Sequence, residues 1–141
     1  MNKNVIISIS GWQLTENFEG EMLELITDGE LAREGNLYSI TYKESELTGL
    51  EGTTTVLEID SDRVILSRSG NVDSQLVFEQ GKKHMGFYET MFGAFTVGVS
   101  TRRISSTLQD SGGNLEIDYT VEVDHALAGQ NNIKMSVREA N

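Results

Sequence analysis

The feature that most constrains this chain is a strict alternation of apolar and polar residues between positions 114 and 124. Successive side chains of an extended strand point to opposite faces, so this pattern predicts a long antiparallel strand with one buried face and one solvated face. Polar or charged residues occupy every intervening position. The buried face is predicted to carry Leu115, Ile117, Tyr119, Val121 and Val123.

The same alternation, or a short run of apolar and β-branched residues, recurs along the rest of the chain. Residues that supply the positive φ of tight hairpins, mainly Gly, Asn and Asp, separate these segments at intervals of about ten residues. The stretch 43–52 reads as a longer connection. We therefore predict about ten strands, each joined to its neighbour in sequence. The alternating segments are 36–43, 94–103, 114–124 and 133–137, and the shorter runs are 4–9, 22–27, 53–59, 63–68, 75–79 and 84–88.

Consecutive antiparallel strands with one apolar face can bury that face in two stable arrangements, a closed barrel or two packed sheets. The continuous order of the strands favours the barrel, and closure removes exposed strand edges that no proline in this chain would protect. We predict an all-β fold, a single closed antiparallel up-and-down barrel of eight to ten strands that occupies residues 1–141 as one domain. A barrel of about eight strands is filled by side chains or holds one small ligand.

Charge and composition remove several classes of function. The chain has no cysteine, so disulfides, thiolate metal sites and cysteine nucleophiles are excluded. The formal net charge is -11. Because an acidic protein repels polyanions, we expect no binding to nucleic acid. The apolar run at 5–7 is too short for a signal peptide or a membrane span, so we expect a cytoplasmic protein without membrane contact.

Nothing in the sequence forms a recognisable catalytic set. The two histidines, His84 and His125, read as surface and loop residues, and no pair of them stands at metal-ligand spacing. Nucleophile elbows, phosphate loops and dinucleotide fingerprints are also absent from the sequence. We therefore expect no catalytic residues, no metal and no cofactor, and we expect that the protein is not an enzyme.

Two arginines interrupt faces that alternation assigns to the interior. The face of Leu66 continues to Arg68, and the face of Val99 continues to Arg103. A buried guanidinium requires a partner, either an internal glutamate or the carboxylate or phosphate of an amphipathic ligand. In the alternative, both arginines lie at strand ends and extend into water. Tyrosine hydroxyls on apolar rings would complete a ligand site, and the candidates are Tyr42, Tyr88 and Tyr119.

Strand and hairpin motifs in the second half of the chain resemble those of a known family. They are Arg68-Ser69-Gly70-Asn71-Val72, Gln75-Leu76-Val77-Phe78-Glu79 with Gly81, and Tyr88-Glu89-Thr90 with Gly93, Ser100 and Thr101. In these motifs the chain resembles the YwiB-like family of small bacterial proteins, most strongly over 36–139. The resemblance implies a lipocalin-like, calycin-type β-barrel in a bacterial cytoplasm, and it implies no activity.

Two functions remain open at this point. The first is a barrel that binds a small apolar or amphipathic ligand in its interior, anchored by Arg68, Arg103 and the tyrosine hydroxyls. The second is a protein-interaction or structural module that binds a partner or forms a homodimer through its outer wall and takes no ligand. A barrel fold supports either function, so only the chemistry of a site can distinguish them.

Overall fold

The structure, a computed structural model, describes residues 1–14, 20–44, 51–90 and 93–140. The described residues form strands joined by turns, and none of them is helical. No helix in this part of the chain is therefore long and apolar enough to cross a membrane. The strands are β1 (Asn2–Leu14), β2 (Gly20–Glu34), β3 (Leu37–Lys43), β4 (Thr53–Ile59), β5 (Arg63–Gly70), β6 (Asp73–Glu79), β7 (Lys83–Thr90), β8 (Gly93–Ser106), β9 (Gly112–Val123) and β10 (Ala126–Glu139).

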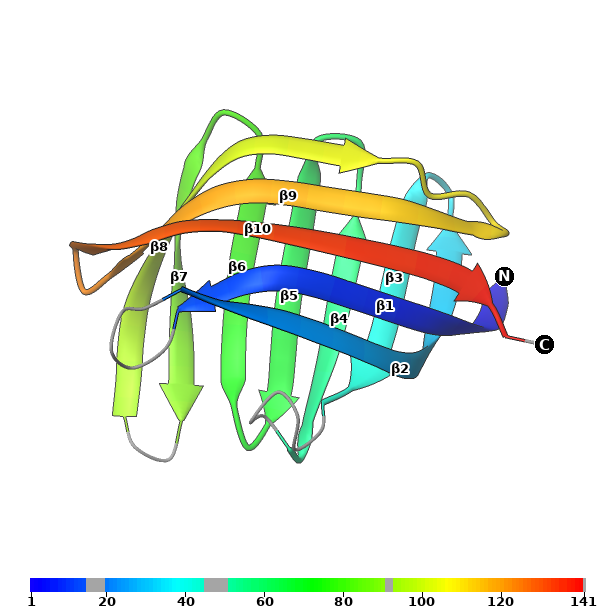
Figure 1. Ribbon diagram of the computed structural model, residues 1–141, viewed down its shortest axis with the longest axis horizontal. Helices are drawn as coiled ribbons and strands as arrows, with labels where there is room; N and C mark the ends of the chain where they lie inside the picture. Colours follow the sequence, from blue (N-terminus) through cyan, green and yellow to red (C-terminus); the bar gives the residue numbers. More distant parts are fainter. Residues whose placement is uncertain (15–19, 45–50, 91–92, 141) are drawn as a thin grey trace.

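Every strand pairs antiparallel with its neighbours in sequence, and β1 pairs with β10 to close the barrel. The predicted closed up-and-down barrel is thus confirmed, with ten strands. In Figure 1 the long strands β8, β9, β10, β1 and β2 run across the front, and β3 to β7 cross behind them at a steep angle. The barrel is therefore flattened into two curved halves that share one interior.

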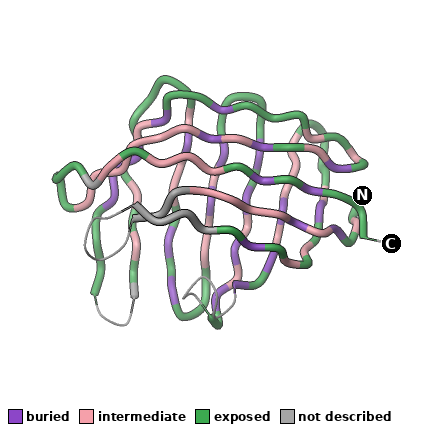
Figure 2. Tube along the Cα trace, viewed as in Figure 1, coloured by how far each residue is buried: buried purple, intermediate pink, exposed green. Residues whose placement is uncertain are grey.

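The core lies between these two halves, and its side chains come from alternate positions of the strands. On β9 the predicted inner face is correct, since Leu115 and Ile117 are buried and Tyr119 and Val121 pack against the core. Figure 2 shows the same alternation as buried segments that line up across neighbouring strands. Burying one such side chain stabilises the fold by about 1.5 to 3 kcal/mol, so the core is the main source of stability.

The predicted turns connect the strands where expected, with bends or turns at 35–36, 61–62, 71–72, 80–81 and 110–111. The turn after β5 requires glycine for two reasons. Gly70 has a φ of 123°, and a Cβ at this position would lie 2.2 Å from the carbonyl oxygen of Gly52. Part of the longer connection predicted at 43–52, residues 45–50, lies outside the described residues.

Candidate binding site in the barrel interior

A row of polar side chains crosses the inner face of β3 to β7. Tyr42 faces Thr55, Thr55 faces Arg68, Arg68 faces Ser74, and Ser74 faces Tyr88, each across one pair of strands. We call these five residues the inner row. They lie toward the end of the barrel at which β3, β5 and β7 finish, the lower edge of Figure 1. Polar groups inside a barrel need partners there, so this row is the first candidate for a site.

Arg68 turns inward, as alternation predicted, and finds an acidic partner inside the barrel. Its Nε lies 3.7 Å from Oε1 of Glu44, the residue that follows β3. The side chain of Glu44 is 2% exposed and that of Arg68 is 18% exposed. The hydroxyl of Thr55 donates a hydrogen bond of 2.6 Å to the same Glu44 oxygen. The positive charge of Arg68 is therefore compensated by an internal carboxylate.

Glu44 is the residue of this site that our sequence analysis did not assign. The signal was present, because the buried face of Tyr38, Ile40 and Tyr42 reaches Glu44 at the next step of two residues. Its backbone amide donates to the carbonyl of Thr53 at 2.8 Å, which extends the β3–β4 ladder by one position. This continuation of the pairing turns the carboxylate inward.

Three polar atoms among the described residues are buried without a hydrogen-bond partner. They are Nε of Arg68, Oγ of Ser74 and Oγ1 of Thr101. Arg68 and Ser74 face each other across β5 and β6, near the start of β6. Thr101 lies beside the β6–β7 turn at the other end of β6, where its amide donates to the carbonyl of Lys82 at 3.1 Å. An unpaired buried polar atom costs about 1 to 3 kcal/mol, so native proteins rarely leave one without water or a ligand. The adjacent atoms of Arg68 and Ser74 therefore indicate a place where a further hydrogen-bonding group fits.

Burial shapes the chemistry of two tyrosines next to this surface. Burial, reinforced by the negative charge of Glu44, holds the pKa of Tyr42 well above its usual range. Burial also raises the pKa of Tyr119 to about 12, against the opposing effect of the Arg68 charge. The ring of Tyr119 packs edge-on against Phe78, with ring centroids 4.9 Å apart. Both hydroxyls stay protonated and neutral at physiological pH.

The inner surface reaches solvent near the end of β7 and the start of β8. Phe95 pairs with Tyr88 and lies on the same face of β8 as the core residues Val97 and Val99. A ring on this inner face is expected to be buried, yet Phe95 is 41% exposed. Tyr88 is half-buried and packs against the core. The ring of Phe95 is therefore exposed to solvent next to Tyr88, at the inner-row end of the barrel.

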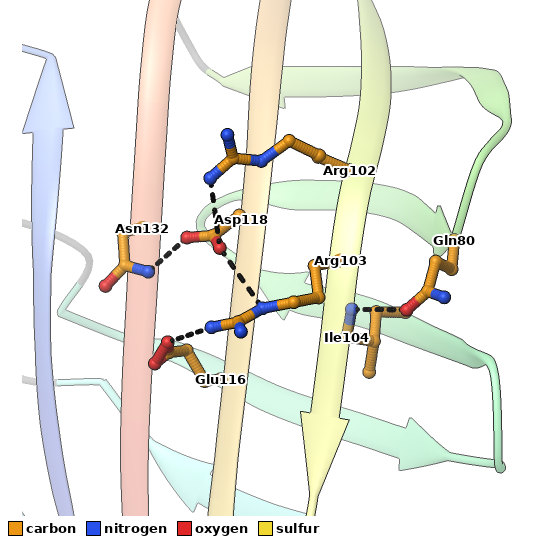
Figure 3. A network of polar contacts seen from close by, with 7 residues as sticks. All are labelled: Gln80, Arg102, Arg103, Ile104, Glu116, Asp118 and Asn132. Carbon is orange, nitrogen blue, oxygen red and sulfur yellow. Dashed lines mark hydrogen bonds and ion pairs between the residues drawn. The ribbon is translucent and has the colours of Figure 1, made fainter.

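Arg103 lies on the outer wall, which corrects the inner placement predicted from alternation. Arg102 is an extra residue in β8, because Thr101 pairs with Tyr119 and Arg103 with the next residue, Asp118. This β-bulge shifts the alternation by one, so Arg103 points outward and is 58% exposed. Its Nη2 lies 2.7 Å from Glu116 and its Nε lies 3.5 Å from Asp118, and both contacts are drawn in Figure 3.

The bulge left a signal in the sequence. The inner positions Val97, Val99 and Thr101 repeat every two residues, but the next buried apolar residue, Ile104, follows Thr101 by three. The strand therefore changes phase between Thr101 and Ile104. Arg103 takes no part in the interior site.

The outer-wall charges around the bulge bind one another. Asp118 accepts a hydrogen bond from the side-chain amide of Asn132 and contacts Arg102 at 3.5 Å (Figure 3). The Asn132 hydrogen bond, with a smaller contribution from Arg102, lowers the pKa of Asp118. These contacts link β8, β9 and β10, so their role is to fix strand pairing at the bulge.

The two histidines lie apart from the inner row. Nε2 of His84 is 2.8 Å from Glu79, and this hydrogen bond helps to lower the pKa of the Glu79 carboxyl. His125 is exposed in the β9–β10 turn with a φ of 70°. Within the described ranges, no group of three or more His, Asp or Glu side chains could hold a metal ion.

Comparison with known proteins supports the fold. Residues 7–135 match the family described as "Domain of unknown function (DUF1934)". The "Uncharacterized beta-barrel protein YwiB" of Bacillus subtilis (strain 168) is 27% identical over 104 residues, which are 73% of this chain and 71% of that protein. The crystal structure of ywiB protein from Bacillus subtilis aligns with a TM-score of 0.85 at 20% identity, over 99% of this chain and 94% of that one. These matches confirm the resemblance to the YwiB-like family and the barrel.

Proposed function

Because the chain belongs to the DUF1934 family of domains of unknown function, which assigns no activity, we propose a function from the interior alone. We propose that the protein binds a small amphipathic ligand inside the barrel and performs no catalysis. The polar head of the ligand meets Arg68 and Ser74, and its apolar part contacts the rings of Tyr88 and Phe95. Arg103 is not part of this proposal.

Two neighbouring polar atoms without a hydrogen bond, Nε of Arg68 and Oγ of Ser74, carry the proposal. A core built only for stability would place apolar groups at these positions, because a buried hydroxyl or guanidinium nitrogen without a hydrogen bond destabilises the fold. Ser74 illustrates this point, since alanine would fit there and needs no hydrogen bond. A ligand oxygen that bonds these groups would offset their cost.

The surroundings of these atoms support an amphipathic ligand over a purely polar one. The rings of Tyr88 and Phe95 lie together at the inner-row end of the barrel, and the half-buried side chains of Leu76 and Val121 pack at the core boundary. Small-molecule sites commonly combine apolar walls with a few convergent polar groups. A molecule with one polar end and one apolar end matches both parts of this surface.

Native mass spectrometry of the protein purified from its own host tests this function. We expect a stoichiometric small-molecule adduct that is lost on unfolding and can be extracted into organic solvent. Ser74→Ala should reduce the adduct without lowering the free energy of unfolding, because it removes a buried hydroxyl that has no hydrogen-bond partner. A clean mass without any adduct would contradict the proposal.

The control is Arg103→Met, which removes the same kind of charge from the outer wall. This variant should retain the adduct, because Arg103 contacts only outer-wall carboxylates. Equal loss of the adduct in Ser74→Ala and Arg103→Met would place the ligand outside the interior.

A second candidate function, self-association through the outer wall, is favoured by one observation on β6 and β7. Met85 and Phe87 are apolar outer-wall residues that are 50% and 43% exposed. At one end of this surface Asp73 faces Glu89 directly, a like-charge pair that destabilises a lone sheet, and at the other end Lys83 forms an ion pair of 2.6 Å with Glu122. A second copy related by a twofold axis would cover Met85 and Phe87 and remove them from water.

Sedimentation equilibrium tests this second candidate. The protein should sediment as a dimer at micromolar concentration, and Phe87→Ser should yield monomers without changing the fold. Ile26→Ser is the matched control, because Ile26 is an exposed apolar residue of β2 on a different part of the wall. A monomeric wild-type protein would exclude this function.

A further inference from the structure

The interior site is already electrically balanced before any ligand enters. Arg68 supplies one positive charge, and Glu44 supplies one negative charge at 3.7 Å from it. The carboxylate is held in place by the 2.6 Å hydrogen bond from Thr55 and is almost fully buried. The charge of Arg68, which by itself would attract an anion, therefore has a resident partner.

A carboxylate or phosphate ligand would introduce a second negative charge beside Glu44. Like charges in a poorly solvated site disfavour each other strongly, and only one of the two can be matched by the single arginine. An anionic ligand would also have to give up its hydration on entering the barrel. The electrostatics of this site therefore oppose an acidic head group.

The hydrogen-bonding groups that remain open suit an uncharged head group. Nε of Arg68 can only donate, and the hydroxyl of Ser74, which faces Arg68, can donate and accept. A ligand hydroxyl or carbonyl oxygen can accept from Nε, and a ligand hydroxyl can also donate to the serine oxygen. Such a head group satisfies the unpaired atoms and adds no charge.

We infer that the ligand of this barrel has a neutral head group with hydroxyl or ester oxygens, and that Glu44 excludes acidic ligands of the same chain length. This inference rests on the proposed binding function and specifies its ligand class. Glu44 is thus a specificity-determining residue, which acts through its charge beside Arg68 and needs no contact with the ligand.

Matched lipids that differ only in the head group test this inference. The probes are lauric acid, lauryl alcohol and the glycerol monoester of lauric acid, titrated into the delipidated wild-type protein at neutral pH by isothermal calorimetry. We expect the monoester to bind at least about tenfold more tightly than the acid. The alcohol should fall between them, because it offers one oxygen where the monoester offers several.

Glu44→Gln removes the internal charge and keeps the size of the side chain and an oxygen for Thr55. In this variant Arg68 is uncompensated, so the preference should shift toward lauric acid by about tenfold or more. Glu116→Gln, which removes an outer-wall carboxylate, is the control and should leave the preference of the wild type unchanged. If Glu44→Gln fails to fold, the ratio of the wild-type affinities for the monoester and for lauric acid tests the preference for a neutral head group by itself.

The outcomes separate the inference from the function on which it rests. If the wild type binds lauric acid as tightly as the monoester, or Glu44→Gln leaves the ratio unchanged, the neutral head group and the role of Glu44 are wrong while lipid binding stands. If the wild type binds none of the three probes, both the binding function and the inference are overturned.

Discussion

Arg68 and Arg103 show how strongly the surroundings decide what one residue type does. Arg68 lies inside the barrel beside the buried carboxylate of Glu44, and Arg103 lies on the wall beside Glu116 and Asp118. Water screens the outer pair, so that pair contributes little to stability. Within the interior the two charges depend on each other, because removing one leaves the other buried without compensation.

Arg68→Met should therefore destabilise the protein by about 2 to 4 kcal/mol, since it leaves the Glu44 carboxylate uncompensated. Arg103→Met, the matched outer-wall variant, should cost less than about 1 kcal/mol. Urea unfolding followed by circular dichroism measures both values. Equal effects of the two substitutions would mean that the Arg68–Glu44 pair is as well solvated as the surface pairs.

The buried tyrosines predict a loss of stability in alkali. The pKa of Tyr119 is raised from 10 in the unfolded chain to about 12 in the fold, and that of Tyr42 is raised as well. A raised folded-state pKa stabilises the fold fully below the unfolded pKa, and this stabilisation is lost as the pH rises. Each of these tyrosines should thus reduce the free energy of unfolding by about 1.4 kcal/mol per pH unit above pH 10.

Urea unfolding at a series of pH values between about 9 and 12 checks this slope. Tyr119→Phe keeps the ring that packs on Phe78 and removes the titrating hydroxyl, so the slope should become shallower. An unchanged slope in this variant would show that the Tyr119 hydroxyl ionises as freely in the folded protein as in the unfolded chain.

Among the elements, β8 departs from regular strand geometry at its bulge. The bulge at Arg102 shifts the register of β8 against β9. The backbone amide of the next inner residue, Ile104, donates a hydrogen bond of 2.9 Å to the side-chain oxygen of Gln80. The adjacent turn also bonds β8, since Gly81 donates to the carbonyl of Thr101 at 2.9 Å. The β6–β7 turn therefore supplies the partners that β8 needs beside its bulge (Figure 3).

Gln80→Ala should destabilise the protein by about 1 kcal/mol, because the amide of Ile104 loses its acceptor. Gln80→Glu retains an acceptor oxygen and should keep most of the wild-type stability. Thermal unfolding monitored by circular dichroism compares the two variants. A wild-type midpoint for Gln80→Ala would show that water replaces the glutamine oxygen without cost.

At the scale of the whole molecule, closure joins strands from the two ends of the chain. β1 and β10 pair from Val5 with Glu139 to Gly11 with Ile133, and the two termini lie close together in Figure 1. Ile7 and Val137, which face each other in this seam, are both core residues. Opening the seam would expose the interior, so the seam should open only when the whole barrel unfolds.

Native-state hydrogen exchange tests this cooperativity. The protected amides of the β1–β10 ladder should exchange with the same free energy as those of the β5–β6 ladder in the middle of the chain. Both should equal the free energy of global unfolding measured in urea. Faster exchange confined to the β1–β10 ladder would show that the barrel opens at its seam.

Local pattern determined most of the fold. Alternation identified the inner faces of β3 and β9, and turn residues located the hairpins, because strand geometry and backbone sterics act over a few neighbouring residues. The same local rule placed Arg68 inside, and it would have placed Glu44 there too, one step beyond Tyr42.

The tertiary structure alone decided what those inner residues meet. The bulge in β8 moved Arg103 to the wall, because a strand's register depends on its pairing partner as well as on its own period. The pairing of β3, β4 and β5 set Glu44 against Arg68, and the fold left the hydroxyls of Ser74 and Thr101 buried without hydrogen-bond partners. These contacts join residues from different strands, so their chemistry is decided only when the strands pair and the interior forms.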